Sequence, residues 1–248
     1  MRIATCQLHE VLGDMDRAVS VLRTQALAAA DGGAELVCFP EGFLQGYELR
    51  AGHVTHAALD LDSAAFRVLL RQFASIDPVI VVGLIERSGD HHFNTAVAIR
   101  RGAVLTRYRK TDLLPAEKDM FTAGDGPVVF DVSGVRIGLA ICHDLTSPDF
   151  ARRMAHQQAQ VLVCPCNNML PREVAEQWKD RHGVLRSERA REHGLWVVTS
   201  EVTGERDGWI ACAPTAIIDS KGSVVAQVPK LEEGRVWADV TVPLPLPS

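Results

Sequence analysis

Short apolar segments of strand length recur along the whole chain, and segments with the periodicity of an α-helix separate several of them. This alternation constrains the fold more than any other feature, because strands that alternate with helices form sheets whose faces the helices cover. We expect helices at residues 15–30, 63–74, 148–158 and 173–193. We expect strands at residues 3–8, 36–39, 79–84, 95–99, 104–108, 128–132, 135–141, 161–164, 196–200, 215–219, 224–228 and 236–240.

Three turns between neighbouring apolar segments predict β-hairpins. They lie at residues 100–102, 133–134 and 220–222, and each contains a glycine. Hairpins pair strands antiparallel whereas helical connections allow parallel pairing, so the sheets should be mixed. Because there is no Ser/Gly-rich linker and no repeat, we expect one layered α/β domain over residues 1–248, with an irregular, proline-rich tail at 242–248.

The charge balance argues against a polyanionic partner. The chain has 26 Lys and Arg against 31 Asp and Glu, a formal net charge of -5, and no long run of one sign. Nucleic acid is therefore not expected as a partner. Several arginines gather in the segment 181–191, but Glu188 and Glu192 lie among them, so we predict a solvated, ion-paired helix face there.

Cysteine use and hydropathy indicate a cytoplasmic protein without a membrane span. No segment reaches the roughly 18 to 20 uninterrupted apolar residues of a membrane helix, and the N-terminal segment reads as a strand rather than a signal peptide. The six cysteines are too few and too irregularly spaced for a disulfide framework. Cys164 and Cys166 lie one residue too close for a zinc or redox pair, and the histidines lack ligand spacing, so no metal is expected.

Three polar side chains follow apolar strands, at the position where α/β sheets usually bind ligands. Cys142 ends one such strand and a helix begins soon afterwards, so its thiol and the neighbouring backbone N–H groups can face one space, as an oxyanion hole requires. Glu41 and Lys110 also stand where strands run into loops. Taken singly, each has an ordinary interpretation: a buried thiol, a solvated carboxylate and a surface charge.

Together and in this order, the three segments resemble the nitrilase superfamily of carbon-nitrogen hydrolases, in particular its amidase-like members. The matching motifs are Phe39-Pro40-Glu41, Arg109-Lys110 with the downstream Leu114-Pro115-Ala116-Glu117, and Ile141-Cys142-His143-Asp144. The similarity runs from the N-terminal strand to the strand near Trp237 and so covers nearly the whole chain. It implies a four-layer α-β-β-α sandwich with two mixed sheets of the six-stranded type.

The resemblance also implies hydrolysis of a non-peptide carbon-nitrogen bond of a small amide. Cys142 would attack the carbonyl carbon and form an acyl thioester. Lys110 and the His143 N–H would hold the oxyanion. Glu41 would take the thiol proton, hand it to the departing amine and then deprotonate the water that releases the acid.

Further residues receive roles from the same resemblance. Glu117 would fix Lys110 or help to orient the substrate, and His143, Asn167 and Tyr47 would contact the substrate. Many family members carry an aromatic residue where this chain has His143, so the pocket wall should differ here. No cofactor is implied, and a homodimer or a larger homo-oligomer, extended through helices near the nucleophile, is expected.

Several alternatives stay open at this point. N-carbamoyl amine or amino acid hydrolysis and nitrile hydrolysis are the nearest, although the Trp-Glu that typically follows the cysteine of nitrilases is absent. A catalytically silent scaffold with the same fold is possible from a different class. A papain-like peptidase would need a distant histidine such as His182 or His193. A dyad of Cys142 with His143 is disfavoured, since adjacent residues at a strand end point apart.

Overall fold

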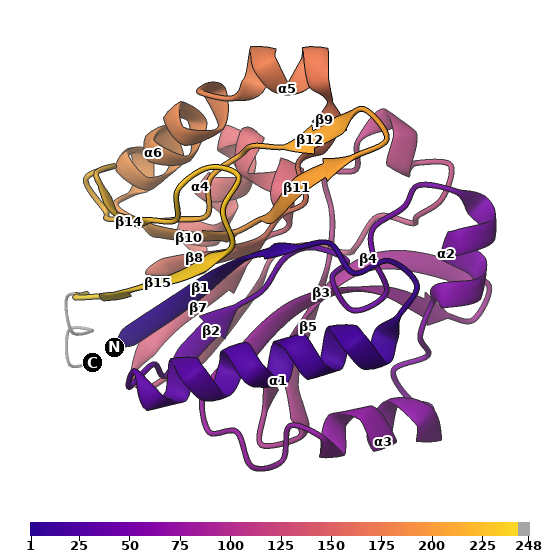
Figure 1. Cartoon of the computed structure of the whole chain (residues 1–248). Coiled ribbons are helices and arrows are strands. Elements are labelled where there is room, and N and C mark those ends of the chain that lie inside the picture. Colours follow the sequence, from indigo (N-terminus) through magenta and orange to yellow (C-terminus); the bar gives the residue numbers. More distant parts are fainter. Residues whose placement is uncertain (243–248) are drawn as a thin grey trace.

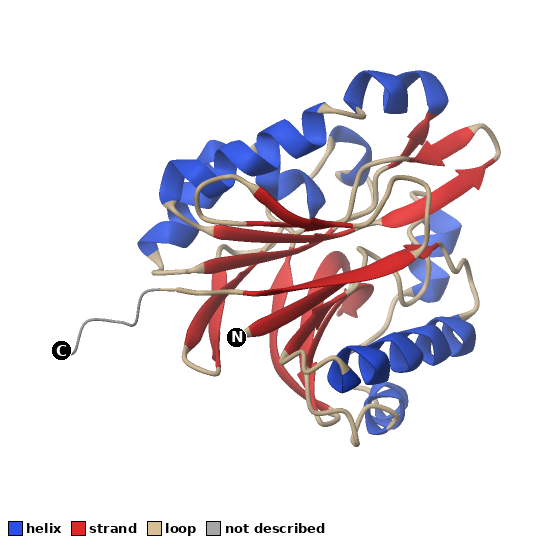
Figure 2. Cartoon of the chain, turned by 60° about the vertical axis from the view of Figure 1, so that its left-hand side comes forward, coloured by secondary structure: helices blue, strands red, loops and turns tan. Residues whose placement is uncertain are grey.

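The computed structural model describes residues 1–242, which form two β-sheets packed face to face with helices on both outer sides (Figures 1 and 2). This is the four-layer α-β-β-α arrangement that the resemblance to the nitrilase superfamily implies. Of the predicted irregular tail, only Val242 belongs to this part, and residues 243–248 lie outside the described residues.

The first sheet has nine strands. Its members are β1 Arg2–His9, β2 Leu36–Cys38, β3 Val79–Ser88, β4 His91–Arg100, β5 Ala103–Arg109, β9 Met169–Pro171, β11 Val202–Arg206, β12 Trp209–Ala211 and β15 Gly234–Asp239. They run in the order β5-β4-β3-β2-β1-β11-β12-β9, and β15 also pairs with β1. β1 is parallel to β2 and β11 but antiparallel to β15, so this sheet is mixed and joins the first described strand to the last.

The second sheet has six strands, also in mixed orientation. They are β6 Val128–Val132, β7 Val135–Leu139, β8 Val161–Pro165, β10 Trp196–Ser200, β13 Ala216–Ile218 and β14 Val224–Gln227. The order is β14-β13-β10-β8-β7-β6, in which β7, β8 and β10 run parallel and the outer strands run antiparallel to their neighbours.

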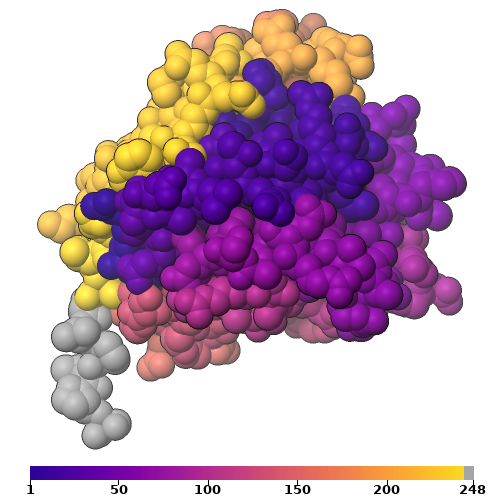
Figure 3. Space-filling view, turned by 60° about the horizontal axis from the view of Figure 1, so that its bottom comes forward, coloured from indigo at the N-terminus to yellow at the C-terminus, as the bar shows by residue number. Residues whose placement is uncertain are grey.

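Helices cover the outer face of each sheet. They are α1 Met15–Asp31, α2 Ala51–Ala57, α3 Ala64–Arg71, α4 Pro148–His156, α5 Arg172–Trp178 and α6 Arg181–His193. α1 and α3 lie against the first sheet, and α4 and α6 lie against the second (Figure 1). Figure 3 views the molecule from the side of α1 and α3. The first third of the chain forms most of this face, and the C-terminal part of the chain lies along one side of it.

Successive side chains of a strand point to opposite faces of its sheet, so each strand contributes to two apolar layers. In β1, Ile3 belongs to the apolar cluster between the sheets, whereas Ala4 and Cys6 point the other way and pack with the buried face of α1. α1 begins at the predicted residue because the side chain of Asp14 accepts a hydrogen bond of 3.0 Å from the backbone N–H of Arg17. The three predicted hairpins are confirmed, as β4-β5, β6-β7 and β13-β14.

The structure adds elements that the sequence pattern did not reveal. α2 and the short strands β9, β11 and β12 were not predicted, and the three strands extend the first sheet beyond the six-stranded type. The predicted helix over residues 173–193 is two helices. At the break, Lys230 donates to the carbonyl oxygen of Lys179 at 2.9 Å and to the carboxylate of Asp180 at 3.2 Å, so a carbonyl at the end of α5 finds its partner in another part of the chain. No helix within residues 1–242 combines the length and apolarity needed to cross a membrane.

Candidate active site

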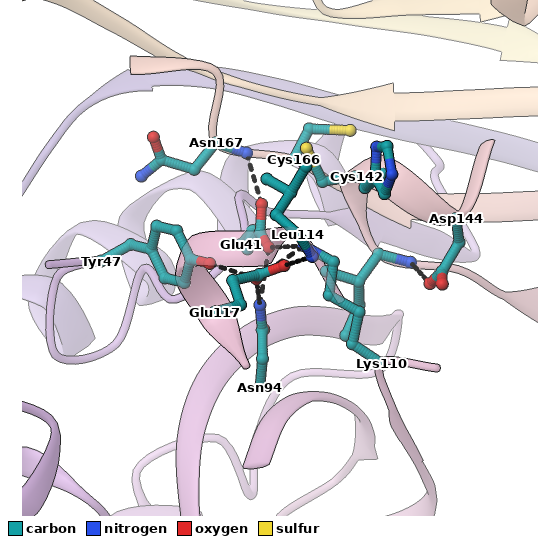
Figure 4. Close-up of polar contacts among 12 residues, drawn as sticks. Glu41, Tyr47, Asn94, Lys110, Leu114, Glu117, Cys142, Asp144, Cys166 and Asn167 are labelled. Carbon is teal, nitrogen blue, oxygen red and sulfur yellow. Dashed lines mark hydrogen bonds and ion pairs between the residues drawn. The ribbon is translucent and has the colours of Figure 1, made fainter. Parts of the chain in front are cut away.

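Glu41, Lys110 and Cys142 lie just beyond the C-terminal ends of β2, β5 and β7. β2 and β5 belong to the first sheet and β7 to the second, so the three side chains approach one another where the sheets face each other. Figure 4 shows Glu41, Lys110 and Glu117 joined by polar contacts, with Cys142 beside them. Sequence segments that are far apart along the chain therefore supply one site.

The Lys110 ammonium lies between two carboxylates. Its Nζ donates to Glu41 Oε1 at 2.9 Å and to Glu117 Oε1 at 2.8 Å. Lys110 and Glu41 are each 1% exposed and Glu117 is 0% exposed. A buried charge is tolerated only when it is paired, so each of the three groups depends on the others.

Hydrogen bonds from neighbouring residues fix both carboxylates. The side-chain amide of Asn94 donates to Glu41 Oε1 at 2.7 Å and to Glu117 Oε1 at 3.1 Å. The second oxygen of Glu41 accepts the backbone N–H of Asn167 at 2.9 Å, and that of Glu117 accepts the backbone N–H of Leu114 at 2.7 Å. Neither carboxylate can turn without losing several hydrogen bonds.

Glycine at position 83 lets the Glu41 backbone pack directly on β3. The Gly83 N–H donates to the carbonyl of Pro40 at 3.1 Å. A Cβ at position 83 would lie 2.4 Å from the backbone nitrogen of Gly42 and 2.5 Å from Glu41 Cα. Since both contacts are backbone atoms, only glycine fits, and the position of Glu41 is set by the strand beneath it.

The environment separates the proton affinities of the two carboxylates. Burial, reinforced by the negative charge of Glu117, raises the pKa of Glu41 even though Lys110 opposes this shift. At Glu117 burial acts in the same direction, but the charge of Lys110 and the hydrogen bonds from Lys110 and Tyr47 outweigh it and lower the pKa. Burial disfavours the Lys110 ammonium, yet the charges around it, Glu41 first, raise its pKa well above the usual value. The surroundings therefore favour the ionised form of Glu117, and Glu41 is the carboxylate better able to take up a proton.

Cys142 begins a tight turn that presents its thiol at the end of β7. Its φ angle is 43°, a left-handed conformation that is costly for a residue with a side chain. The turn is held by the buried carboxylate of Asp144, which accepts the backbone N–H of Ile141 at 2.8 Å and that of Asp112 at 3.0 Å. The Tyr108 hydroxyl donates to the same carboxylate at 2.8 Å.

The surroundings of Cys142 favour the protonated thiol over the thiolate. The thiol donates to Asn168 Oδ1 at 3.8 Å and also contacts the thiol of Cys166. The hydrogen bond with the Cys166 thiol, burial and the charge of Glu41 raise the pKa of Cys142 well above its usual range, while Lys110 acts in the opposite direction. Because only a thiolate is a good nucleophile, this cysteine needs a nearby base.

The three residues predicted to contact substrate occupy different places. His143 lines the pocket next to Cys142, and its Nδ1 lies 3.2 Å from Thr146 Oγ1. Asn167 supports Glu41 through its backbone, and its side chain donates to Glu10 at 3.1 Å. The Tyr47 hydroxyl donates to Glu117 Oε1, and the ring stacks on Phe121 with 6.4 Å between centroids. Only His143 among these three lines the pocket that contains Cys142.

A second buried ion pair adjoins the thiol, and sequence reasoning missed it. Arg186 donates to Glu201 Oε1, and Glu201 accepts the side-chain amide of Asn168 at 2.7 Å. The prediction of a solvated helix face is therefore wrong for Arg186 and Arg189, which are 5% and 4% exposed. The sequence did contain a signal for buried polar groups. Asn94 lies within an apolar strand and Glu201 directly follows one, and a polar residue at such a position is usually buried with a partner.

Within residues 1–242 no group of three or more His, Cys, Asp or Glu side chains is arranged to hold a metal ion. Cys164 and Cys166 lie with their sulfur atoms 3.6 Å apart and are free thiols.

Known proteins share both the sequence pattern and the fold. An (R)-stereoselective amidase from Pseudomonas sp. is 28% identical over 225 residues, covering 90% of this chain and 80% of the amidase. A nitrilase from Pyrococcus abyssi is 29% identical over 236 residues, covering 94% of this chain and 87% of the nitrilase. The crystal structure of an amidase from Nesterenkonia sp. superposes with a TM-score of 0.84 at 24% identity, over 97% of this chain and 90% of that one. A structure of a variant of that amidase shows the acetamide moiety of fluoroacetamide added covalently at its active-site cysteine.

The family comparison covers almost every residue. The sequence model of the family described as carbon-nitrogen hydrolase matches residues 2–244. The match includes Glu41, Lys110, Glu117 and Cys142, which the fold brings to one buried site. The chain therefore belongs to the carbon-nitrogen hydrolase family.

Proposed function

We propose that this protein hydrolyses the carbon-nitrogen bond of a small carboxamide through an acyl thioester on Cys142. The observation that carries the proposal is the buried cluster of Glu41, Lys110 and Glu117, whose charges act on a thiol at a strained strand end. The amidases among its relatives, one of them with an adduct on its active-site cysteine, support the same chemistry.

Glu41 is the proposed proton carrier. Its raised pKa brings it closer to neutral pH, where a carboxylate can both accept and return a proton. It takes the proton of the Cys142 thiol while the sulfur bonds to the carbonyl carbon, and it then delivers this proton to the departing nitrogen. A water molecule afterwards gives a proton to Glu41 while its oxygen bonds to the thioester carbon. The carbon-sulfur bond then breaks, the carboxylic acid leaves, and Glu41 returns the proton to the sulfur of Cys142.

Lys110 is the proposed stabiliser of the oxyanion. An ammonium group has three N–H donors, and two of them bind Glu41 and Glu117, so the third can face the carbonyl oxygen of the substrate. The backbone N–H of His143 follows the strained residue and is the proposed second donor. Each such donor contributes about 3 to 4 kcal/mol to transition-state binding in comparable sites.

A panel of substrates tests the proposal. Ammonia release should be faster from carboxamides than from either nitriles or N-carbamoyl compounds. Quenching the reaction with acid should trap an acyl adduct on the peptide that contains Cys142. Cys142→Ala is the control and should give neither ammonia nor adduct. No ammonia and no adduct from a broad set of amides would favour a silent scaffold instead.

Replacing Gly83 with alanine should displace Glu41. Because the new Cβ would overlap the backbone of residues 41 and 42, we expect a loss of about 1 to 3 kcal/mol in unfolding free energy and a clear fall in kcat. Urea denaturation and initial rates measure the two effects. Gly183→Ala is the matched control, since nothing lies within 4 Å of a Cβ there. Unchanged kcat in Gly83→Ala would contradict the role of this contact.

We also propose a homodimer or a larger homo-oligomer that forms through helices near Cys142. Val174 on α5 is 37% exposed and Val184 on α6 is 57% exposed, and apolar side chains on adjacent exposed helices are typical of interfaces. Light scattering measures the assembly mass. The mass of one chain at all concentrations would contradict this proposal.

We further propose that the chain works as one catalytic domain in the cytoplasm. The family match over residues 2–244 supports a single domain. All six cysteines are free thiols, as is usual in a reducing compartment. Limited proteolysis that yields two stable halves would contradict the first statement, and cell fractionation tests the second.

A further inference from the structure

The pocket that contains Cys142 has mainly apolar walls. It has a volume of about 190 Å³ and extends from Cys142 towards α5 and α6. Its apolar lining is Leu114, Leu145, Leu170, Val174, Trp178 and Leu185. An apolar cavity of about 150 Å³ accommodates benzene, so this space suits a ring with about one or two further carbons, or a branched chain of similar size.

The guanidinium group that reaches this pocket is already neutralised. Arg186 is 5% exposed and donates to the carboxylate of Glu201, which is 0% exposed. It also donates to the carbonyl of Pro214 at 2.8 Å. Glu201 in turn holds the side chain of Asn168, so the ion pair is built into the wall and its charge is not free to bind a substrate carboxylate.

The two imidazoles of the pocket are uncharged at neutral pH. Burial and the neighbouring charges of Arg186 and Lys230 lower the pKa of His182 to about 3. Burial and the charge of Lys110 lower the pKa of His143. His182 packs on the ring of Trp178 with 5.2 Å between centroids, so it forms part of the wall.

Lys110 offers no free charge either, because Glu41 and Glu117 share it. A substrate carboxylate in this pocket would therefore meet no unpaired cation among the residues that line it. Burying such a charge without a partner is strongly unfavourable, whereas an apolar group would gain from leaving water.

We propose that the substrate is an amide of a branched aliphatic or aromatic carboxylic acid whose uncharged acyl group fills this pocket, and that amides carrying a second carboxylate are rejected. This inference rests on the proposed function, because it assumes attack by Cys142 on the amide carbonyl. It goes further in naming the chemical class of the acyl group.

Two amides of the same shape test it. 4-Methylpentanamide ends in an isopropyl group where succinamate ends in a carboxylate, so they differ in charge and hardly in size. We expect kcat/KM to favour 4-methylpentanamide by about 100-fold or more. Equal rates, or faster hydrolysis of succinamate, would overturn the inference while leaving the proposed function intact. If neither is cleaved and acetamide, benzamide and phenylacetamide also release no ammonia, the proposed function itself fails.

A charge placed in the pocket should change this preference. Val174→Lys adds an ammonium group at a partly exposed position of the lining, so we expect the ratio of succinamate to 4-methylpentanamide turnover to rise by about fivefold. Val68→Lys adds the same charge at a 52% exposed position of α3, outside this pocket and away from the proposed interface, and should leave the ratio unchanged. Because both substrates are measured on one preparation, the ratio does not depend on the folded fraction. An unchanged ratio in Val174→Lys would contradict the proposed place of the acyl group.

Discussion

Glu41→Gln is expected to lower kcat/KM for a carboxamide by about 10⁴-fold while the protein stays folded. Glutamine has nearly the same shape but cannot take up a proton, and the raised pKa of the Cys142 thiol favours its protonated form. Without the base, no thiolate forms and the departing nitrogen receives no proton. Initial rates of ammonia release measure the effect, and far-UV circular dichroism checks the fold.

A matched control separates chemistry from the loss of a buried carboxylate. Glu86 is 1% exposed and binds Arg109 at 2.6 Å and Thr95 at 2.7 Å, away from the thiol. Glu86→Gln should therefore reduce stability but change kcat only slightly. If the two variants lose activity to the same extent, Glu41 supports the fold and carries no proton.

The same residue sets the acid side of the pH–rate profile. Glu41 must be ionised to accept the thiol proton, and its pKa is raised above 4.5 because it is buried. Activity should thus fall as the pH drops through that raised value, so the acid limb lies above pH 4.5. An acid limb below that pH would mean that another group is the base.

The candidate site could be predicted from sequence because its chemistry lies at strand ends. Glu41, Lys110 and Cys142 each follow a strand that the apolar pattern predicts, and the packing of the two sheets face to face brings these strand ends together. The structure places Glu117 against Lys110, also as expected. Periodicity predicted only that these residues lie at strand ends, and the resemblance to the nitrilase superfamily, which short local motifs carry, assigned them to one site.

The remaining features depend on contacts between distant segments. Lys230 supplies a hydrogen bond at the break between α5 and α6, and Glu201 supplies the charge that pairs with the buried Arg186. The strands β9 and β12 form by pairing with each other and with β11, which no local pattern in the sequence shows. The place of Tyr47 beside Glu117 likewise follows from folding of the loop after β2 and not from any local pattern.

Lys110→Met is expected to destabilise the protein by about 3 to 5 kcal/mol near neutral pH. Methionine fills a similar volume but removes the ammonium that lies between Glu41 and Glu117, so two buried carboxylates are left facing each other. Urea denaturation measures the loss. A change below about 1 kcal/mol would show that the pair of carboxylates is already neutral in the native protein.

The sign of the pH dependence identifies the cause. Without the ammonium, the folded-state pKa values of both carboxylates should rise above the ordinary value of 4.5. The folded variant then binds protons that the unfolded chain does not, so its stability is full at low pH and is lost as the pH rises through the raised values. The difference from the unmodified protein should be larger at about pH 8 than at about pH 5.

The double variant Lys110→Met with Glu117→Gln distinguishes the two roles of the lysine. Removing one carboxylate relieves the repulsion, and Glu41 can be protonated at little cost, so a large part of the stability should return. Activity should stay about 100- to 1000-fold below that of the unmodified protein, because the donor to the oxyanion is still missing. Recovery of both stability and kcat would mean that Lys110 only balances charge and that the oxyanion is held by backbone N–H groups alone.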